Sequence, residues 1–202
     1  MLISPSDAFE EQGGHALAHS RASAAERRKA LARGRILHRL MQSLPDIPEA
    51  ARKAAIEHYL KNTAADFAPA EQAELARHVL TILNDLVFAD LFAPGSRAEV
   101  PIVGRLAREG APAFTVAGQV DRLAVTGDSV LIADYKTDRT LPSDPAAVPD
   151  RYVGQLALYR AVLQRVYPGK TIRTALIFTG GPTVIELPGA ALDAALATAL
   201  AR

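Results

Sequence analysis

A predicted β-hairpin centred on Gly127-Asp128 constrains the fold more than any other feature of the sequence. With those two residues as the loop, Thr126 pairs with Ser129. Counting outward along the two strands then places Asp121 opposite Asp134. Directly opposed residues in antiparallel strands have Cβ atoms about 4.5–5.5 Å apart. The hairpin therefore predicts two carboxylates facing each other.

The same register gives these acids a cationic neighbour. Because successive strand residues alternate faces, Lys136 shares a face with Asp134, whereas Tyr135 points the other way. Gln119 lies opposite Lys136. Facing carboxylates repel each other unless a cation lies between them, and a divalent metal beside a lysine would supply that charge. The alternative is a simple ion pair at the end of the strand, and spacing alone leaves both interpretations open.

The composition limits the kinds of site that the chain can carry. The chain has 202 residues, is 49% hydrophobic with a net charge of +1, and contains no cysteine. Thiolate zinc sites, disulfides and cysteine-ligated iron–sulfur clusters are therefore excluded. A metal must be held by carboxylate, imidazole or carbonyl groups, which favours Mg²⁺ or Mn²⁺. A GxxxxGK[ST] phosphate loop is absent, and the lack of a long apolar stretch or signal-peptide pattern leads us to expect a cytoplasmic protein without a membrane partner.

The order of predicted elements indicates one layered α/β domain, with a central mixed β-sheet flanked by α-helices and an N-terminal helical segment. Ser23 and Glu26 match a capping box at the start of the first helix. Residues 1–20 have no sustained periodicity and are interpreted as a tether. Periodicity and turn signals predict helices at about 24–43, 48–61, 69–90 and 150–167, strands at about 97–105, 113–125, 130–136, 173–178 and 183–187, a loop at 138–149, and a short C-terminal helix.

Four other residues are candidates for a site. Gln155 and Tyr159 are four residues apart on a predicted helix and so project from one face, as the polar flank of an ordinary amphipathic helix also would. His38 lies on the first predicted helix, where a lone histidine is more often structural than a ligand. Glu99 either extends the acidic cluster or is an edge-strand charge beside a proline.

The first predicted helix is strongly basic although the whole chain is nearly neutral. Such a helix could follow a phosphate backbone. A solvated helix face, or one that docks on an acidic partner, is an equal alternative. The basic residues, set against the single acid Glu26, are Arg21, Arg27, Arg28, Lys29, Arg33, Arg35 and Arg39.

Five motifs occur in an order that resembles a known family. They are G-x-x-x-H at 34–38, E-V-P at 99–101, G-Q-V-D-R-L at 118–123, A-D-Y-K-T at 133–137 and Y-x-x-Q-L-A-L-Y-R at 152–160. Together they resemble the nuclease domain of the RecB/AddA helicase–nucleases, within the PD-(D/E)XK superfamily, over roughly residues 25–190. The V-Y-P-G segment at 166–169 looks particularly like the C-terminal end of AddA-type subunits.

The resemblance implies a restriction-endonuclease-like core and assigns roles to particular residues. His38, Asp121 and Asp134 would be metal ligands, assisted by the carbonyl of Tyr135. Lys136 would be the catalytic lysine beside the catalytic acids. The last two catalytic candidates, Gln155 and Tyr159, would complete the site or contact DNA. Some relatives hold an iron–sulfur cluster with cysteines, so this chain resembles the cluster-free branch.

The implied function is a Mg²⁺- or Mn²⁺-dependent DNA exonuclease or endonuclease within a helicase–nuclease of double-strand break repair and recombination. Its partners would be single-stranded DNA ends, the helicase portion of the same polypeptide and a second, AddB-like subunit. Residues 1–20 would then be the tether to the missing helicase part, and 21–202 the nuclease domain. The alternative is a catalytically silent DNA-binding or scaffolding module. A stand-alone sequence-specific endonuclease finds no support, because no recognition domain is evident.

Overall fold

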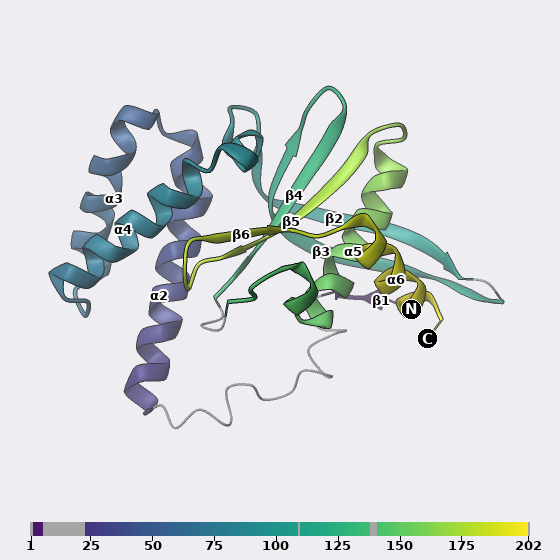
Figure 1. Ribbon diagram of the computed structural model, residues 1–202, viewed down its shortest axis with the longest axis horizontal. Coiled ribbons are helices and arrows are strands. Elements are labelled where there is room, and N and C mark those ends of the chain that lie inside the picture. Colours follow the sequence, from purple (N-terminus) through teal and green to yellow (C-terminus); the bar gives the residue numbers. More distant parts are fainter. Residues whose placement is uncertain (1, 6–22, 109, 138–140, 202) are drawn as a thin grey trace.

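The computed structural model describes residues 2–5, 23–108, 110–137 and 141–201, in which a central sheet lies between two helical layers (Figure 1). The strands are β1 (Leu2–Ile3), β2 (Arg97–Arg108), β3 (Ala111–Val125), β4 (Ser129–Lys136), β5 (Thr171–Phe178) and β6 (Thr183–Glu186). The α-helices are α2 (Ala24–Ser43), α3 (Glu49–Thr63), α4 (Pro69–Leu83), α5 (Asp150–Val166) and α6 (Gly189–Leu200). Short 3₁₀ helices are η1 (Leu44–Asp46), η2 (Leu86–Phe92) and η3 (Pro145–Ala147).

The sheet is mixed, which confirms the predicted α/β class. Its strands follow the order β2–β3–β4–β5–β6, in which only the β4–β5 pair is parallel. The short β1 pairs in parallel with β3 at Thr115 and Val116. The parallel pair at the centre is connected through α5, as parallel strands require a crossover.

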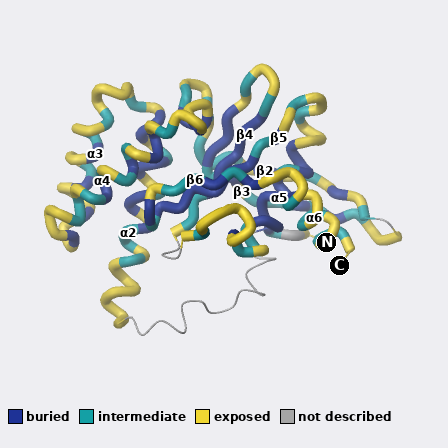
Figure 2. The backbone as a smooth tube through the Cα atoms, in the orientation of Figure 1, coloured by how far each residue is buried: buried dark blue, intermediate teal, exposed yellow. Residues whose placement is uncertain are grey.

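The two faces of the sheet are covered by different helices. One core cluster joins α5 and α6 to one face, and a second joins α2, α3, α4 and η2 to the other. Along β4, Val130 and Ile132 enter the first cluster, whereas Leu131 and Ala133 enter the second. This strand is therefore buried on both sides, as its nearly continuous apolar run predicts. Figure 2 shows the buried centre of the sheet with exposed backbone around it.

The register predicted for the hairpin is confirmed. Val125 pairs with Val130 and Arg122 pairs with Ala133, which is the alignment obtained from a Gly127-Asp128 loop. The backbone N–H of Thr126 donates to the carbonyl of Ser129 at 2.8 Å. The ladder stops at the Arg122–Ala133 pair, so the predicted strand pairs Asp121–Asp134 and Gln119–Lys136 are not formed.

The predicted helix over residues 69–90 is wrong in its last third. α4 ends at Leu83, and the separate helix η2 begins at Leu86. Asn84 caps α4, and the side chain of Asp85 accepts a hydrogen bond from the N–H of Val87. Asn and Asp favour such caps because their short polar side chains compete with the helical backbone for hydrogen bonds.

The other predicted elements agree with the structure to within a few residues at their ends. The capping box of Ser23 and Glu26 is present at the start of α2. Leu2–Ile3 lies against the sheet, but most of the predicted tether, residues 6–22, lies outside the described residues. None of the helices in the described ranges is both long and apolar enough to cross a membrane.

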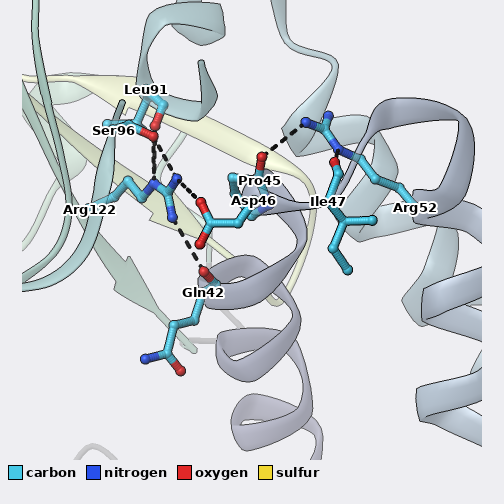
Figure 3. A network of polar contacts seen from close by, with 8 residues as sticks. All are labelled: Gln42, Pro45, Asp46, Ile47, Arg52, Leu91, Ser96 and Arg122. Carbon is cyan, nitrogen blue, oxygen red and sulfur yellow. Dashed lines mark hydrogen bonds and ion pairs between the residues drawn. The ribbon is translucent and has the colours of Figure 1, made fainter. Parts of the chain in front are cut away.

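A buried arginine fastens the N-terminal helical layer to the sheet (Figure 3). The side chain of Arg122 on β3 is only 1% exposed. Its guanidinium donates to the carbonyls of Gln42 at 3.3 Å and Leu91 at 3.2 Å, and to the hydroxyl of Ser96 at 2.6 Å. It also lies 3.5 Å from the carboxylate of Asp46. Gln42 lies one turn beyond His38 on α2. The hydrogen bonds of Arg122 therefore fix the position of this part of α2 relative to β3.

Candidate active site and metal centre

The candidate site forms where β3 and β4 separate. Their paired ladder ends at Arg122 and Ala133, so the next residues of each strand, Asp121 and Asp134, lie at the opening. The backbone N–H of Tyr135 donates to Oδ2 of Asp121 at 2.5 Å. A carboxylate thus takes the place of a strand carbonyl, and the ladder cannot continue past it.

The other edge of β3 is also interrupted at the same residue. The neighbours of Glu99 and Asp121 on both sides form regular β2–β3 pairs, but these two residues do not pair. The intact register on either side places Glu99 directly opposite Asp121. Three acids from three neighbouring strands, Glu99, Asp121 and Asp134, are therefore aligned across the sheet at this break.

Helix α2 brings His38 to this row of acids. Nε2 of His38 lies 3.0 Å from Oε1 of Glu99 and 3.1 Å from Oδ1 of Asp121. The imidazole packs edge-on against the ring of Tyr135, with 5.5 Å between ring centroids. A Cβ added to Gly34 would lie 2.7 Å from Cγ2 of Thr137, so glycine allows α2 to approach the end of β4 one turn before the histidine.

Asp134 belongs to a second polar group, on the α5 side of the sheet. Its Oδ2 lies 2.5 Å from Nζ of Lys136, and its Oδ1 accepts from Nε2 of Gln155 at 3.1 Å. Lys136 also donates to Oε1 of Gln155 at 2.8 Å, which closes a triangle of three side chains. The ammonium lies 4.1 Å from the ring centroid of Tyr152, a cation–π contact.

Tyr159 follows Gln155 by four residues on α5 and is fully buried. Its hydroxyl accepts a hydrogen bond from the backbone N–H of Gln119 at 3.2 Å, two residues before Asp121. A Cβ added to Gly118 would overlap the same hydroxyl oxygen. The tyrosine hydroxyl therefore contacts the backbone of β3, whereas the side chain of Gln155 contacts Asp134 directly.

The charges at the opening influence one another. The contact with Asp121 raises the pKa of His38 above its usual value, although burial acts in the opposite direction. Burial raises the pKa of Asp134, and the adjacent Lys136 opposes that shift. The nearby Asp121 carboxylate raises the pKa of Asp134 further. These shifts are those expected when several acids share one partly dry site.

The donor atoms fit the divalent ion predicted from the sequence. His38, Glu99 and Asp121 each present a ligand atom, and these atoms lie within 4.8 Å of one another. Nε2 of His38 is shielded from solvent and has a carboxylate oxygen of Glu99 and one of Asp121 within 3.1 Å. Imidazole and carboxylate donors suit Mg²⁺ or Mn²⁺. The cysteine thiolates that ligate iron–sulfur clusters are absent from the sequence.

The structure divides the predicted site residues into two neighbouring groups. His38 and Asp121 meet each other, and Asp134 meets Lys136 and Gln155. A ligand role for the Tyr135 carbonyl stays a prediction, as do the roles of the other site residues. The sequence interpretation did not include Tyr152 in the site, although it begins the Y-x-x-Q motif and therefore carried a signal.

Two basic residues of α2 form ion pairs with acids of the same chain. Lys29 pairs with Glu71 at 2.7 Å and Arg33 with Glu74 at 3.4 Å, and both pairs join α2 to α4. These two cations are therefore already paired within the chain, and the two alternatives for the rest of the basic face stay predictions. Arg28 and Arg35 are exposed, and Arg35 lies one turn before His38.

Comparison with known proteins identifies relatives of this chain. A family model described as the PD-(D/E)XK nuclease superfamily matches residues 13–200. The A subunit of the ATP-dependent helicase/nuclease from Streptococcus sanguinis (strain SK36) is 31% identical over 153 residues, 73% of this chain. The protein with the same name from Streptococcus pneumoniae (strain CGSP14) is 42% identical over 67 residues, 33% of this chain. That from Desulforudis audaxviator (strain MP104C) is 40% identical over 75 residues, 35% of this chain.

These relatives are much longer than the matched region. The chain spans 12% of the length of the S. sanguinis protein, 5% of the S. pneumoniae protein and 6% of the D. audaxviator protein. Among solved structures, one described as "Crystal structure of SSO0001" covers 98% of this chain and 83% of its own, at 12% identity with a TM-score of 0.36. That likeness is too loose to support any statement about the site.

Proposed function

Because this chain belongs to the PD-(D/E)XK nuclease superfamily, whose members use divalent metals, we propose that it hydrolyses phosphodiester bonds in DNA with Mg²⁺ or Mn²⁺. The observation that carries the proposal is the meeting of two polar groups at the opening between β3 and β4. One group contains His38 and Asp121, and the other contains Asp134 and Lys136. Anionic ligands beside a cationic lysine are what metal-assisted phosphodiester hydrolysis requires.

The proposed division of labour follows the two groups. His38, Asp121 and Asp134, with the carbonyl of Tyr135, would hold the ion. When bound, a divalent ion supplies positive charge to the scissile phosphate and lowers the pKa of an attacking water. Asp121 and Asp134 come from strands of the rigid sheet, which favours a fixed geometry over one set by a loop.

Lys136 would orient the attacking water and stabilise the negative charge that develops on the phosphate. Its ammonium is already fixed by Asp134, Gln155 and the ring of Tyr152. A charge held in place before the reaction needs no rearrangement when the transition state forms. Gln155 connects Asp134 to Lys136. We propose that Tyr159 positions β3 through its hydrogen bond with the backbone of Gln119.

We extend the proposal to the setting that the relatives suggest. Residues 21–202 would be the nuclease domain of a helicase–nuclease, with residues 1–20 leading to the helicase portion. An AddB-like subunit would be a second partner, and single-stranded DNA ends the substrate. The complex would act in double-strand break repair and recombination in the cytoplasm.

Digestion of end-labelled single-stranded DNA tests the proposed activity. The native chain is compared with Asp134→Ala and Lys136→Ala in the presence of Mg²⁺, Mn²⁺ or EDTA. Because both side chains belong to the proposed machinery, we expect each variant to lose at least about 100-fold in cleavage rate. Lys61→Ala and Asp193→Ala remove one exposed charge of each sign elsewhere and should cleave like the native chain.

The outcomes separate the possible roles. Undiminished cleavage by both site variants would show that the chemistry lies elsewhere. An inert native chain that binds Mn²⁺ in calorimetry, with binding lost in Asp134→Ala, would indicate a site that requires the helicase for activity. An inert chain that binds no Mn²⁺ would instead favour the catalytically silent DNA-binding module.

A further inference from the structure

The first turn of α5 carries an arginine on the helix face that meets the candidate site. Arg151 is four residues before Gln155, so the two side chains project from the same face of the helix. Gln155 contacts both Asp134 and Lys136 on β4. Arg151 therefore lies one helical turn beyond this polar group, toward the N-terminus of α5, and it is half-buried there.

The ring of Tyr152 connects this arginine to the lysine of the site. Nζ of Lys136 lies 4.1 Å from the ring centroid, and the guanidinium carbon of Arg151 lies 4.4 Å from the same centroid. The two charged centres are therefore at most about 8.5 Å apart, the sum of these distances. Nη2 of Arg151 also donates to the Tyr152 hydroxyl at 3.0 Å. One aromatic side chain thus holds two cations close together.

This grouping of charges is not one that folding alone favours. The N-terminus of a helix carries partial positive charge, so a cation in the first turn is unfavourable there. The preceding residue, Asp150, is the acid that such a turn favours. Two cations at this separation also repel each other, and the side chain of Lys136 is only 12% exposed, so solvent screens its charge poorly. Asp134 offsets the charge of Lys136, but a bound anion would stabilise both cations.

The alternative is that Arg151 stacks on Tyr152 only as a surface packing contact. Arginine stacks on aromatic rings in many settings. However, its planar guanidinium also matches the oxygens of a phosphate group, and stacking orients that plane before a ligand arrives. The proposed reaction brings a DNA phosphate to Lys136, on the same ring. The stacked arginine is therefore within reach of the strand that the lysine serves.

From this arrangement we infer that Arg151 binds a backbone phosphate of the DNA beside Lys136, and that Tyr152 is the residue that positions both cations. The strand is then held on the α5 side of the opening between β3 and β4. This inference rests on the proposed nuclease function, which supplies the DNA. It adds a phosphate contact to that function and needs no metal ligand.

Binding of a labelled single-stranded oligonucleotide, followed by fluorescence anisotropy with EDTA over a series of salt concentrations, tests the role of Arg151. We expect Arg151→Gln to weaken binding about 10-fold, because a charge-assisted hydrogen bond is lost. The slope of log affinity against log salt concentration should fall by about 0.7. The matched control is Arg165→Gln, which removes an exposed arginine roughly 21 Å away along the same helix and should leave the slope unchanged.

Variants of Tyr152 test its positioning role. Tyr152→Phe keeps the ring and should retain most of the affinity, whereas Tyr152→Leu removes the ring and should weaken binding as Arg151→Gln does. Adding Arg151→Gln to Tyr152→Leu should then cause little further loss, because the arginine is no longer held in place. Additive losses would show that the two residues act independently, and would overturn the role of Tyr152. Circular dichroism checks that each variant is folded, and Arg151→Gln remains the test if Tyr152→Leu is not.

The outcomes separate this inference from the proposed activity. Native affinity and slope in Arg151→Gln, or an equal loss in Arg165→Gln, would overturn the phosphate contact and leave the nuclease proposal standing. Binding that depends on Arg151 in a chain that binds no Mn²⁺ in calorimetry would support the contact and contradict the metal-dependent activity. A native chain that binds no single-stranded DNA would overturn both the contact and the proposed substrate.

Discussion

At the residue scale, the candidate site depends on glycines that let helices approach the sheet closely. Gly34 allows α2 to reach the end of β4, and Gly118 allows the Tyr159 hydroxyl to reach β3. In both cases the glycine lies a few residues from a proposed ligand, His38 or Asp121. The motifs that carry these glycines therefore have a packing reason as well as a chemical one.

The contact between Gly118 and Tyr159 predicts that two substitutions will be coupled. Gly118→Ala should cost about 1–3 kcal/mol in the free energy of unfolding, because its Cβ would overlap the tyrosine oxygen. Tyr159→Phe should cost about 1–3 kcal/mol, because the N–H of Gln119 loses this acceptor. The double variant should lose at least about 1 kcal/mol less than the sum, since phenylalanine has no oxygen to overlap.

Urea denaturation of the two single variants, the double variant and the native chain measures this coupling. Ala157→Gly, a change on the same helix away from Gly118, combined with Gly118→Ala provides an uncoupled comparison. Additive losses in the Gly118–Tyr159 pair would mean that β3 moves away from α5 without resistance. The hydroxyl would then have no part in positioning Asp121.

Contacts between site residues were predictable from sequence only where strand alternation determined them. Asp134 and Lys136 share a face because they are two residues apart on a regular strand, and their contact follows directly. Glu99 could not be placed in the same way, because its left-handed backbone breaks the alternation. Its proximity to His38 depends on the packing of α2, which no local spacing encodes.

At the element scale, the site requires that α2 keep a fixed position relative to β3. The guanidinium of Arg122 does this by donating to carbonyls of α2 and η2 from within the core (Figure 3). Its carboxylate neighbour, Asp46, has a side chain that is 72% exposed, so solvent screens that ion pair. The hydrogen bonds to Gln42, Leu91 and Ser96 are therefore the part of the network that contributes stability.

This distinction predicts unequal effects for the two partners of the ion pair. Arg122→Met should cost about 2–4 kcal/mol in the free energy of unfolding, because it leaves buried carbonyls without donors. Asp46→Ala should cost at most about 1 kcal/mol, the value typical of an exposed pair. Chemical denaturation of both variants measures the difference. Equal losses would show that the ion pair, and not the carbonyl contacts, fastens α2.

Helices and strands with clear turn, capping or periodicity patterns in their own sequence were predicted well. The one overextended helix, at 69–90, also has a cause in its local sequence. The hairpin, the capping box and α5 all match their predicted positions closely. The helix over 69–90 was extended too far because the apolar spacing of Leu83 and Leu86 continues past Asn84-Asp85. Capping by those two residues overrides the spacing, and η2 then turns to meet Arg122.

At the scale of the whole molecule, the distribution of positive charge matters more than its near-neutral sum. Lys29 and Arg33 are committed to acids on α4, so the basic helix offers fewer cations to a partner than its sequence indicates. Arg28 and Arg35 are seven residues apart and thus lie on one face of α2, both exposed. Arg35 is three residues before His38, so this face leads toward the proposed metal site.

If this face follows the DNA backbone, binding to single-stranded DNA should weaken steeply with salt. Each phosphate contact contributes about 0.7 to the slope of log affinity against log salt concentration for single strands. Removing Arg28 and Arg35 together, as R28Q and R35Q, should therefore lower the slope by about 1.4. Lys53 and Lys61 are exposed on α3, and K53Q with K61Q removes the same charge as a matched control.

Fluorescence anisotropy with a labelled oligonucleotide, over a series of salt concentrations with EDTA present, measures both slopes without cleavage. The control pair should retain the native slope, because general attraction by net charge falls off over a Debye length of about 10 Å at 0.1 M salt. A slope lowered equally by the two pairs would indicate diffuse attraction and no track on α2. A slope lowered only by R28Q with R35Q would place the phosphates of the DNA along α2. Because α2 also carries His38, the bound DNA strand would then lead to the proposed metal site.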